Sequence, residues 1–144
     1  MAAQFSLRYD YEFFPFSPVK ILSFDNGTRF IDIFLVANTP DGKRAKLYAV
    51  NSATGIVESG IAFYVNGVVS REPVIQAGHW DMLGIYFSDL LNLNSVNGKL
   101  SVSGPVTVNN ISLYDANPTS GAANLVGTYK TTSTIAAGGS MSVT

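Results

Sequence analysis

Short runs of hydrophobic residues, separated by clusters of Gly, Asn and Pro, recur along the whole chain. Inside these runs the spacing of an amphipathic helix is hard to find, and Val, Ile, Tyr and Phe dominate, which is typical of antiparallel β-strands. The pattern predicts about ten strands. We expect them at residues 19–25, 29–37, 44–50, 60–65, 68–75, 80–87, 90–93, 99–103, 106–114 and somewhere within 124–143.

Turn residues lie between these runs at short, regular intervals. Asn66-Gly67 separates two β-rich runs, and both residue types tolerate the positive φ that a two-residue type I′ hairpin requires. The segments at 38–43 and 95–100 predict similar turns with longer loops, and Asn26-Gly27 predicts a fourth. The Asn109-Asn110 pair interrupts an otherwise hydrophobic strand, which predicts a bulge or bend.

Strict alternation in the run "KLSVSG" indicates how the strands are layered. Leu100 and Val102 fall on one face, and Lys99, Ser101 and Ser103 fall on the other, as expected when one face of a sheet is solvated. A single sheet of this kind would leave its apolar face in water. The sequence therefore predicts an all-β fold in which two antiparallel sheets pack face to face, a β-sandwich or jelly roll.

Composition narrows the kinds of partner that fit this chain. Its 144 residues suit one domain with a core of its own, and cysteine is absent, so a disulfide framework and a thiol nucleophile are excluded. Charged residues make up only 13% and the formal net charge is −1. Because nucleic acids and anionic membranes reward dense Lys/Arg surfaces, neither is expected as a partner, which leaves protein or neutral glycan.

Membrane insertion and signal-directed export are not expected either. The longest apolar run, at residues 31–37, is broken by Asp32 and is far shorter than the roughly 20 residues of a membrane-spanning helix. The opening "MAAQFSLRYDYEFF" contains acidic residues and lacks the apolar stretch of a signal peptide.

The two ends of the chain differ from the predicted sandwich domain at 19–115. Residues 1–18 carry more aromatic area than a free terminus should leave in water, and we expect these aromatic side chains to form an assembly arm: Phe5, Tyr9, Tyr11, Phe13, Phe14 and Phe16. Residues 116–144 are rich in Ala, Gly, Ser and Thr and form either an arm or a final strand. At each end, the alternative is a segment that folds back on its own domain.

Reactive groups are sparse. The only histidine, His79, precedes the only tryptophan, Trp80, but no G-x-S-x-G motif or cysteine accompanies it, so a structural residue at a strand start is the favoured interpretation. A ligand contact and a catalytic role are the weaker alternatives. Trp80, with Leu83, Ile85 and Phe87, is expected to fill the sandwich.

The acidic residues are scattered singly beside turns. Hydrolysis of a glycoside needs two facing acids, and Glu72 with Asp81 is the least unfavourable pair. No cofactor is expected, because no phosphate-binding loop is present and no D-x-D-x-D-G spacing supports calcium. A calcium site would draw on four aspartates: Asp25, Asp32, Asp41 and Asp89. Tyr48, Tyr64, Tyr86 and Tyr129 could stack on sugar rings, although packing in the core or an interface is the favoured role.

Residues 60–115 carry a more specific pattern: "GIAFYVNGVVS", then "GHWDMLGIYFSDLL", then "NGKLSVSGPVTVNNISLYDA". This order of a Y-V-N-G strand end, a W-x-x-L-G-I-x-F strand and a G-P-x-x-x-N-N-I-S-x-Y strand resembles the concanavalin A-like, laminin-G-like jelly-roll modules of structural proteins in tailed bacteriophages. The resemblance implies a virion location in a tail, baseplate, fibre or capsid-accessory position, without enzymatic activity.

Three functions follow, in order of support. The leading hypothesis is a non-enzymatic structural protein of a virion that contacts other virion proteins, with homo-oligomers expected, through its terminal arms. The alternative is a glycan-binding module for attachment to a host surface. An enzyme is the third, and it requires an acid pair that converges in space.

Overall fold

Every regular element of the described chain is a β-strand. The computed structural model describes residues 2–25, 30–57, 61–66, 68–70, 73–87, 99–114 and 125–143. Within these ranges no helix is found, and therefore none with the length and apolar character to cross a bilayer. The strands are β1 (Ala2–Tyr9), β2 (Val19–Asp25), β3 (Phe30–Ala37), β4 (Arg44–Asn51), β5 (Ile61–Val65), β6 (Val68–Ser70), β7 (Val74–Gln76), β8 (Asp81–Phe87), β9 (Lys99–Ser103), β10 (Val106–Tyr114), β11 (Leu125–Ile135) and β12 (Ser140–Val143).

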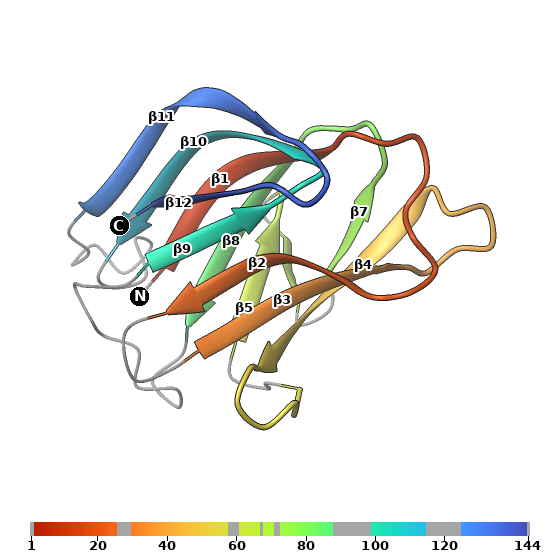
Figure 1. Ribbon diagram of the computed structural model, residues 1–144, viewed down its shortest axis with the longest axis horizontal. Helices are drawn as coiled ribbons and strands as arrows, with labels where there is room; N and C mark the ends of the chain where they lie inside the picture. The colour runs from red at the N-terminus through yellow and green to blue at the C-terminus, as the bar shows by residue number, and fades with distance from the viewer. Residues whose placement is uncertain are drawn as a thin grey trace.

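These strands form two six-stranded antiparallel sheets that pack against each other (Figure 1). The first sheet has the order β11-β10-β1-β8-β5-β6, and the second has the order β12-β9-β2-β3-β4-β7. The chain crosses between the layers repeatedly: only β2 to β4, β5 to β6 and β10 to β11 follow each other within one sheet. The prediction of an all-β, two-sheet antiparallel β-sandwich is confirmed.

The core lies between the sheets and follows the alternation of the sequence. In β3, Ile31, Ile33 and Leu35 are fully buried, whereas the residues between them are only partly covered. The predicted alternation in β9 is confirmed in the same way, because Leu100 and Val102 are buried and Lys99 is exposed. Burial of each such side chain contributes roughly 1.5–3 kcal/mol, so the two inner faces hold the layers together.

The predicted boundary of the sandwich at residue 19 is wrong. Residues 2–9 form β1, which lies inside the first sheet and pairs with both β8 and β10. Its inward residues Phe5, Leu7 and Tyr9 are buried in the core. Phe5 and Tyr9 are therefore core residues rather than parts of an arm, because every second residue of an alternating strand faces the second sheet. Of the two alternatives, a free arm or a segment that folds back on its own domain, residues 2–9 adopt the second.

Two other segments differ from the expected strands. The run at 68–75 is not one strand: β6 belongs to the first sheet and β7 to the second. Pro73 lies between them, and a proline cannot donate a hydrogen bond to a strand ladder. Near the end of the chain two strands, β11 and β12, replace the single strand expected within 124–143, and each lies at the edge of a different sheet. The expected strand at 90–93 lies outside the described residues.

The predicted special turns are found where they can be observed. Val65 pairs with Val68, and Asn66 has a φ of 50°, as a two-residue hairpin requires. Asn110 has a φ of 56°, and the register between β10 and β11 shifts between Asn109 and Ile111, so the predicted bulge is confirmed. Gly67 and the turn at Asn26-Gly27 lie outside the described residues.

The buried position of β1 predicts a large difference between two phenylalanines of the same segment. Phe5→Ala should lower the free energy of unfolding by roughly 3–5 kcal/mol, because it opens a cavity between the sheets. The matched control Phe13→Ala, in the half-exposed position after β1, should cost less than about 1 kcal/mol. Urea unfolding measures both, and a small effect of Phe5→Ala would contradict the central placement of β1.

Candidate functional site

One end of the sandwich collects the loops that carry unusual side chains. Strand register places the end of β1, the start of β8, the start of β10 and the end of β11 at this end, since Leu7 pairs with Asp81, and Val106 pairs with both Tyr9 and Ile135. In the second sheet the start of β4 pairs with the end of β7, Arg44 opposite Gln76. Backbone hydrogen bonds join the loops of both sheets here, so we call it the loop end; it lies at the right of Figure 1.

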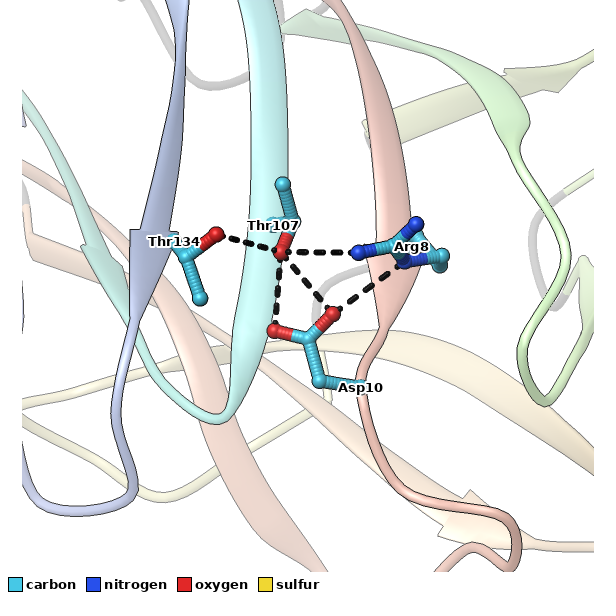
Figure 2. Close-up of polar contacts among 4 residues, drawn as sticks. All are labelled: Arg8, Asp10, Thr107 and Thr134. Carbon is cyan, nitrogen blue, oxygen red and sulfur yellow. Dashed lines mark hydrogen bonds and ion pairs between the residues drawn. The ribbon is translucent and has the colours of Figure 1, made fainter.

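A polar network on the outer face of the first sheet joins the strands where they enter the loop end (Figure 2). Thr107 Oγ1 lies 2.8 and 2.9 Å from the two carboxylate oxygens of Asp10, and Arg8 Nε lies 3.2 Å from Asp10 Oδ1. A hydroxyl has one proton, so Thr107 donates to Asp10 and accepts from Thr134 at 3.0 Å and from Arg8 Nη2 at 3.4 Å. Thr107 is only 1% exposed. The network ties β1, β10 and β11 together directly after β1.

Arg8 also covers Trp80, where the sequence prediction is wrong. The guanidinium carbon lies 4.9 Å from the ring centroid, a cation–π contact across the outer face, and Trp80 is 40% exposed. Trp80 shares strand parity with Met82, which points outward, whereas Leu83 and Ile85 fill the core as expected. The side chain of Phe87 lies outside the described residues.

Residues 10–18, between β1 and β2, form what we call the aromatic loop. Its centre is anchored inward, because the buried Phe14 ring packs against Tyr9 at a centroid distance of 4.6 Å. Its backbone is anchored as well: Phe14 N donates to Gly42 O at 2.7 Å, and Ala37 N donates to Pro15 O at 2.8 Å. The loop is therefore held at two points of the hairpin that joins β3 to β4.

Three side chains of this anchored loop point into solvent. Tyr11, Phe13 and Phe16 are 53%, 50% and 67% exposed. Gly42, which has a φ of 69°, lies against two of them: a Cβ there would stand 3.4 Å from Phe16 Cζ and 3.5 Å from Phe13 Cβ. Of the six predicted arm residues, the structure thus buries Phe5, Tyr9 and Phe14 and presents the other three on the aromatic loop.

A surface cavity of about 490 Å³ opens beside the aromatic loop. Its lining mixes acids, bases and neutral polar groups: Glu12, Thr39, Asp41, Lys43, Arg44, Gln76 and Ala77. From the sequence, Asp41 was predicted only as a calcium ligand and the other lining residues were not predicted as a site, because no residue spacing relates the aromatic loop, the turn between β3 and β4, and β7. Their convergence follows from the register of the second sheet and the path of the aromatic loop.

Ionisable groups near the cavity are fixed by local hydrogen bonds. The Lys43 backbone N–H and then the Thr39 hydroxyl, at 3.0 and 2.7 Å from Asp41 Oδ1, hold the pKa of Asp41 below its usual value. The Lys43 charge acts in the same direction. At the end of β1, desolvation by burial and then the neighbouring Tyr11 raise the pKa of Tyr9. Asp41 is thus a negatively charged turn former, and Tyr9 is neutral near pH 7.

His79 and Asp81 form a second polar group at the same end. His79 Nδ1 lies 3.3 Å from Asp81 Oδ1, and Asn66 Nδ2 donates to the same oxygen at 3.1 Å. Asn66 Oδ1 accepts from Met82 N at 2.9 Å, so the contacts tie the hairpin after β5 to the start of β8. Within the described residues, Asp81 Oδ2 is buried without a hydrogen-bond partner. No serine hydroxyl bonds to His79 in this part of the chain, as a nucleophilic pair would require.

The other candidate site residues do not converge. Asp25 and Asp32 line a cavity of about 290 Å³ on the outer face of the second sheet, where Lys20 and Lys99 accompany them, whereas Asp41 lies at the loop end. Across the described residues, no group of three or more His, Asp or Glu side chains is arranged to hold a metal ion. Glu72 and Asp89, which the acid pair and the calcium site required, lie outside the described residues.

The tyrosines considered for sugar stacking are partly engaged elsewhere. The Tyr48 ring stacks on Phe34 at 5.8 Å, and desolvation raises its pKa. Tyr64 and Tyr129 are partly covered on their strands, and hydrogen bonds from Thr131 and then Ser133 lower the pKa of Tyr129. The side chain of Tyr86 lies outside the described residues.

Physically, the loop end offers a binding surface. Arg8, Asp10 and Thr107 are joined to one another, which fixes their geometry, whereas the aromatic rings of the loop and the charged side chains that line the cavity are exposed. No protein-family model, no curated protein and no solved structure matches this chain. The resemblance of residues 60–115 to phage modules therefore stays a prediction.

The network in Figure 2 predicts a strong effect at one buried threonine. Thr107→Val keeps the shape but leaves Asp10, Arg8 and Thr134 without their common partner, so the free energy of unfolding should fall by roughly 1–3 kcal/mol. Thr132→Val, at an exposed position of β11, is the control and should change it by about 0.5 kcal/mol or less. Equal effects in thermal or urea unfolding would show that the network does not brace the fold.

Proposed function

We propose that this chain is a non-enzymatic structural protein of a phage virion, which docks on a neighbouring protein through the aromatic loop. The observation that carries the docking role is the exposure of Tyr11, Phe13 and Phe16 on a loop whose backbone is held by hydrogen bonds. Contiguous exposed aromatic side chains are typical of protein interfaces, where aromatic residues are enriched at the centre.

The energetics of this surface favour docking. A fully buried aromatic side chain removes 150–250 Å² from water, so burial of the remaining exposed half of each ring contributes roughly 2–3 kcal/mol at about 25 cal/mol per Å². The loop is already ordered by Phe14 and by the bonds to Gly42 and Ala37. Binding would therefore cost little additional conformational entropy, which makes a rigid aromatic loop a good anchor.

The absence of catalysis and the virion location rest on different support. At the loop end Arg8 bonds to Asp10 and His79 bonds to Asp81. The hydroxyl that Arg8 and Asp10 contact, that of Thr107, is only 1% exposed, which does not suit a nucleophile that must reach a substrate. The virion location rests on the likeness of "YVNG", "WDMLGIYF" and "GPVTVNNISLY" to phage structural modules. The aromatic loop takes over the assembly role that the sequence analysis assigned to the whole of residues 1–18.

A triple substitution of the aromatic loop tests the proposal. Tyr11→Ser/Phe13→Ser/Phe16→Ser should fold normally, because all three positions are exposed, yet its incorporation into particles should fall roughly tenfold or more. The measurement is quantitative mass spectrometry of purified particles assembled with wild-type or variant chain.

The matched control removes equally exposed apolar side chains elsewhere. Ile56→Ser/Val68→Ser/Val69→Ser changes residues that are 67%, 70% and 57% exposed at the side edge of the sandwich. We expect this control to be incorporated like wild type. If the triple aromatic variant is incorporated as well as the control, the aromatic loop is not the docking surface.

Glycan binding is a second candidate, favoured by the cavity beside the aromatic loop. Hydrogen-bonding side chains in the lining, such as Thr39 and Gln76, suit a polyhydroxylated ligand, and Glu12 of the aromatic loop is part of the same lining. A glycan array with and without calcium measures this, and Gln76→Ala should lower any saccharide signal at least severalfold. Silence of the wild-type protein across surface polysaccharides would remove this candidate.

A further inference from the structure

We propose that the partner docked on the aromatic loop is a second copy of this chain, related to the first by a two-fold axis. The inference rests on the proposed docking role of that loop, and it adds the identity of the occupant and the geometry of the contact. Aromatic rings form the centre of the contact, and charges of opposite sign form its rim.

The rim carries one acid and one base that are unpaired within the described residues. Glu12 lies between Tyr11 and Phe13 on the aromatic loop, and Arg44 lies at the start of β4; both line the cavity beside the loop. Within the described residues, neither of them forms an ion pair. The other two rim charges, Asp41 and Lys43, act on each other within one turn.

A two-fold contact uses such a pair twice. In an isologous interface each residue meets the partner's copy of another residue, and the converse contact is made at the same time. If Glu12 of one copy faces Arg44 of the second, then Arg44 of the first faces Glu12 of the second. Aromatic rings at the centre then meet aromatic rings, and no like charges are opposed across the axis.

The charge balance of the chain favours this occupant over others. A formal net charge of −1 gives two copies little long-range repulsion. Equal numbers of acids and bases around the cavity suit neither a polyanion nor a strongly basic partner. A surface that carries both signs beside an apolar centre is complementary to itself, without any second sequence being required.

Charge reversal on each side of the pair supplies a specific test. Glu12→Lys places base against base, and Arg44→Glu places acid against acid, so each variant alone should dimerise at least tenfold more weakly than wild type. In an equimolar mixture, Lys at position 12 of one variant faces Glu at position 44 of the other, and the remaining Arg44 faces the remaining Glu12. Dimerisation should therefore return in the mixture as a heterodimer.

Analytical ultracentrifugation across a wide concentration range measures the dissociation constants, with a fluorescent label on one variant to report the heterodimer. Lys99→Glu, at the opposite end of the sandwich, is the control for charge change alone and should dimerise like wild type. Glu12→Gln and Arg44→Gln should weaken dimerisation by less than the reversals, and their mixture should associate with intermediate strength, because the heterodimer keeps one of the two Glu12–Arg44 pairs. Circular dichroism checks that each exposed substitution leaves the β-fold intact.

The outcomes separate this inference from the proposed function. A wild-type chain that stays monomeric, or a mixture that fails to associate, overturns the second copy as the occupant. If the triple aromatic variant nevertheless loses incorporation into particles, the docking role stands with a different protein as partner. If the mixture associates while incorporation is unaffected, the two-fold contact stands and the proposed route of assembly fails.

Discussion

The structure depends on the insertion of β1 between β8 and β10. This strand supplies ladder hydrogen bonds on both of its edges and places Phe5, Leu7 and Tyr9 between the sheets, so it joins the two halves of the first sheet. Without it, β8 and β10 would each present an unpaired edge, and the inner face of the second sheet would lose its covering side chains. The aromatic loop inherits its position from this arrangement, because it begins where β1 leaves the sheet.

Rigidity at the loop end comes from groups that bond to each other rather than to a ligand. Thr107 donates a hydrogen bond to Asp10, the first residue after β1. Phe14 packs against Tyr9 at the end of the sandwich, and the backbone of the loop bonds to the turn that contains Gly42. Each contact contributes modestly, about 1 kcal/mol for a typical hydrogen bond, but together they fix a segment that lies outside regular structure. A fixed loop can expose aromatic rings without the entropy cost that a flexible arm would have on binding.

Features of this structure could be predicted from the sequence where they depend on neighbouring residues, and not where they depend on residues far apart along the chain. Local signals were sufficient for β2, β9 and β10, whose bounds match, and for the Asn66 hairpin and the Asn110 bulge, because alternation and positive φ are properties of neighbouring residues. They failed at β1, where clustered aromatics resembled an arm. The prediction for Trp80 failed because it ignored alternation, which places Trp80 on the face opposite to Leu83 and Ile85, where Arg8 covers it. Glu12 and Arg44 are 32 positions apart in the numbering and meet at one cavity only through sheet register, which no short pattern encodes.

The order of the first sheet also bears on synthesis. Ala2 pairs with Tyr114 and Tyr86, so the ladders of β1 cannot close until the distant strands β8 and β10 have been made. Contacts this distant along the chain make folding slow, and until they form, a strand with an apolar face is open to pairing with other nascent chains. The same central strand that secures the finished sandwich therefore completes its pairing late in folding.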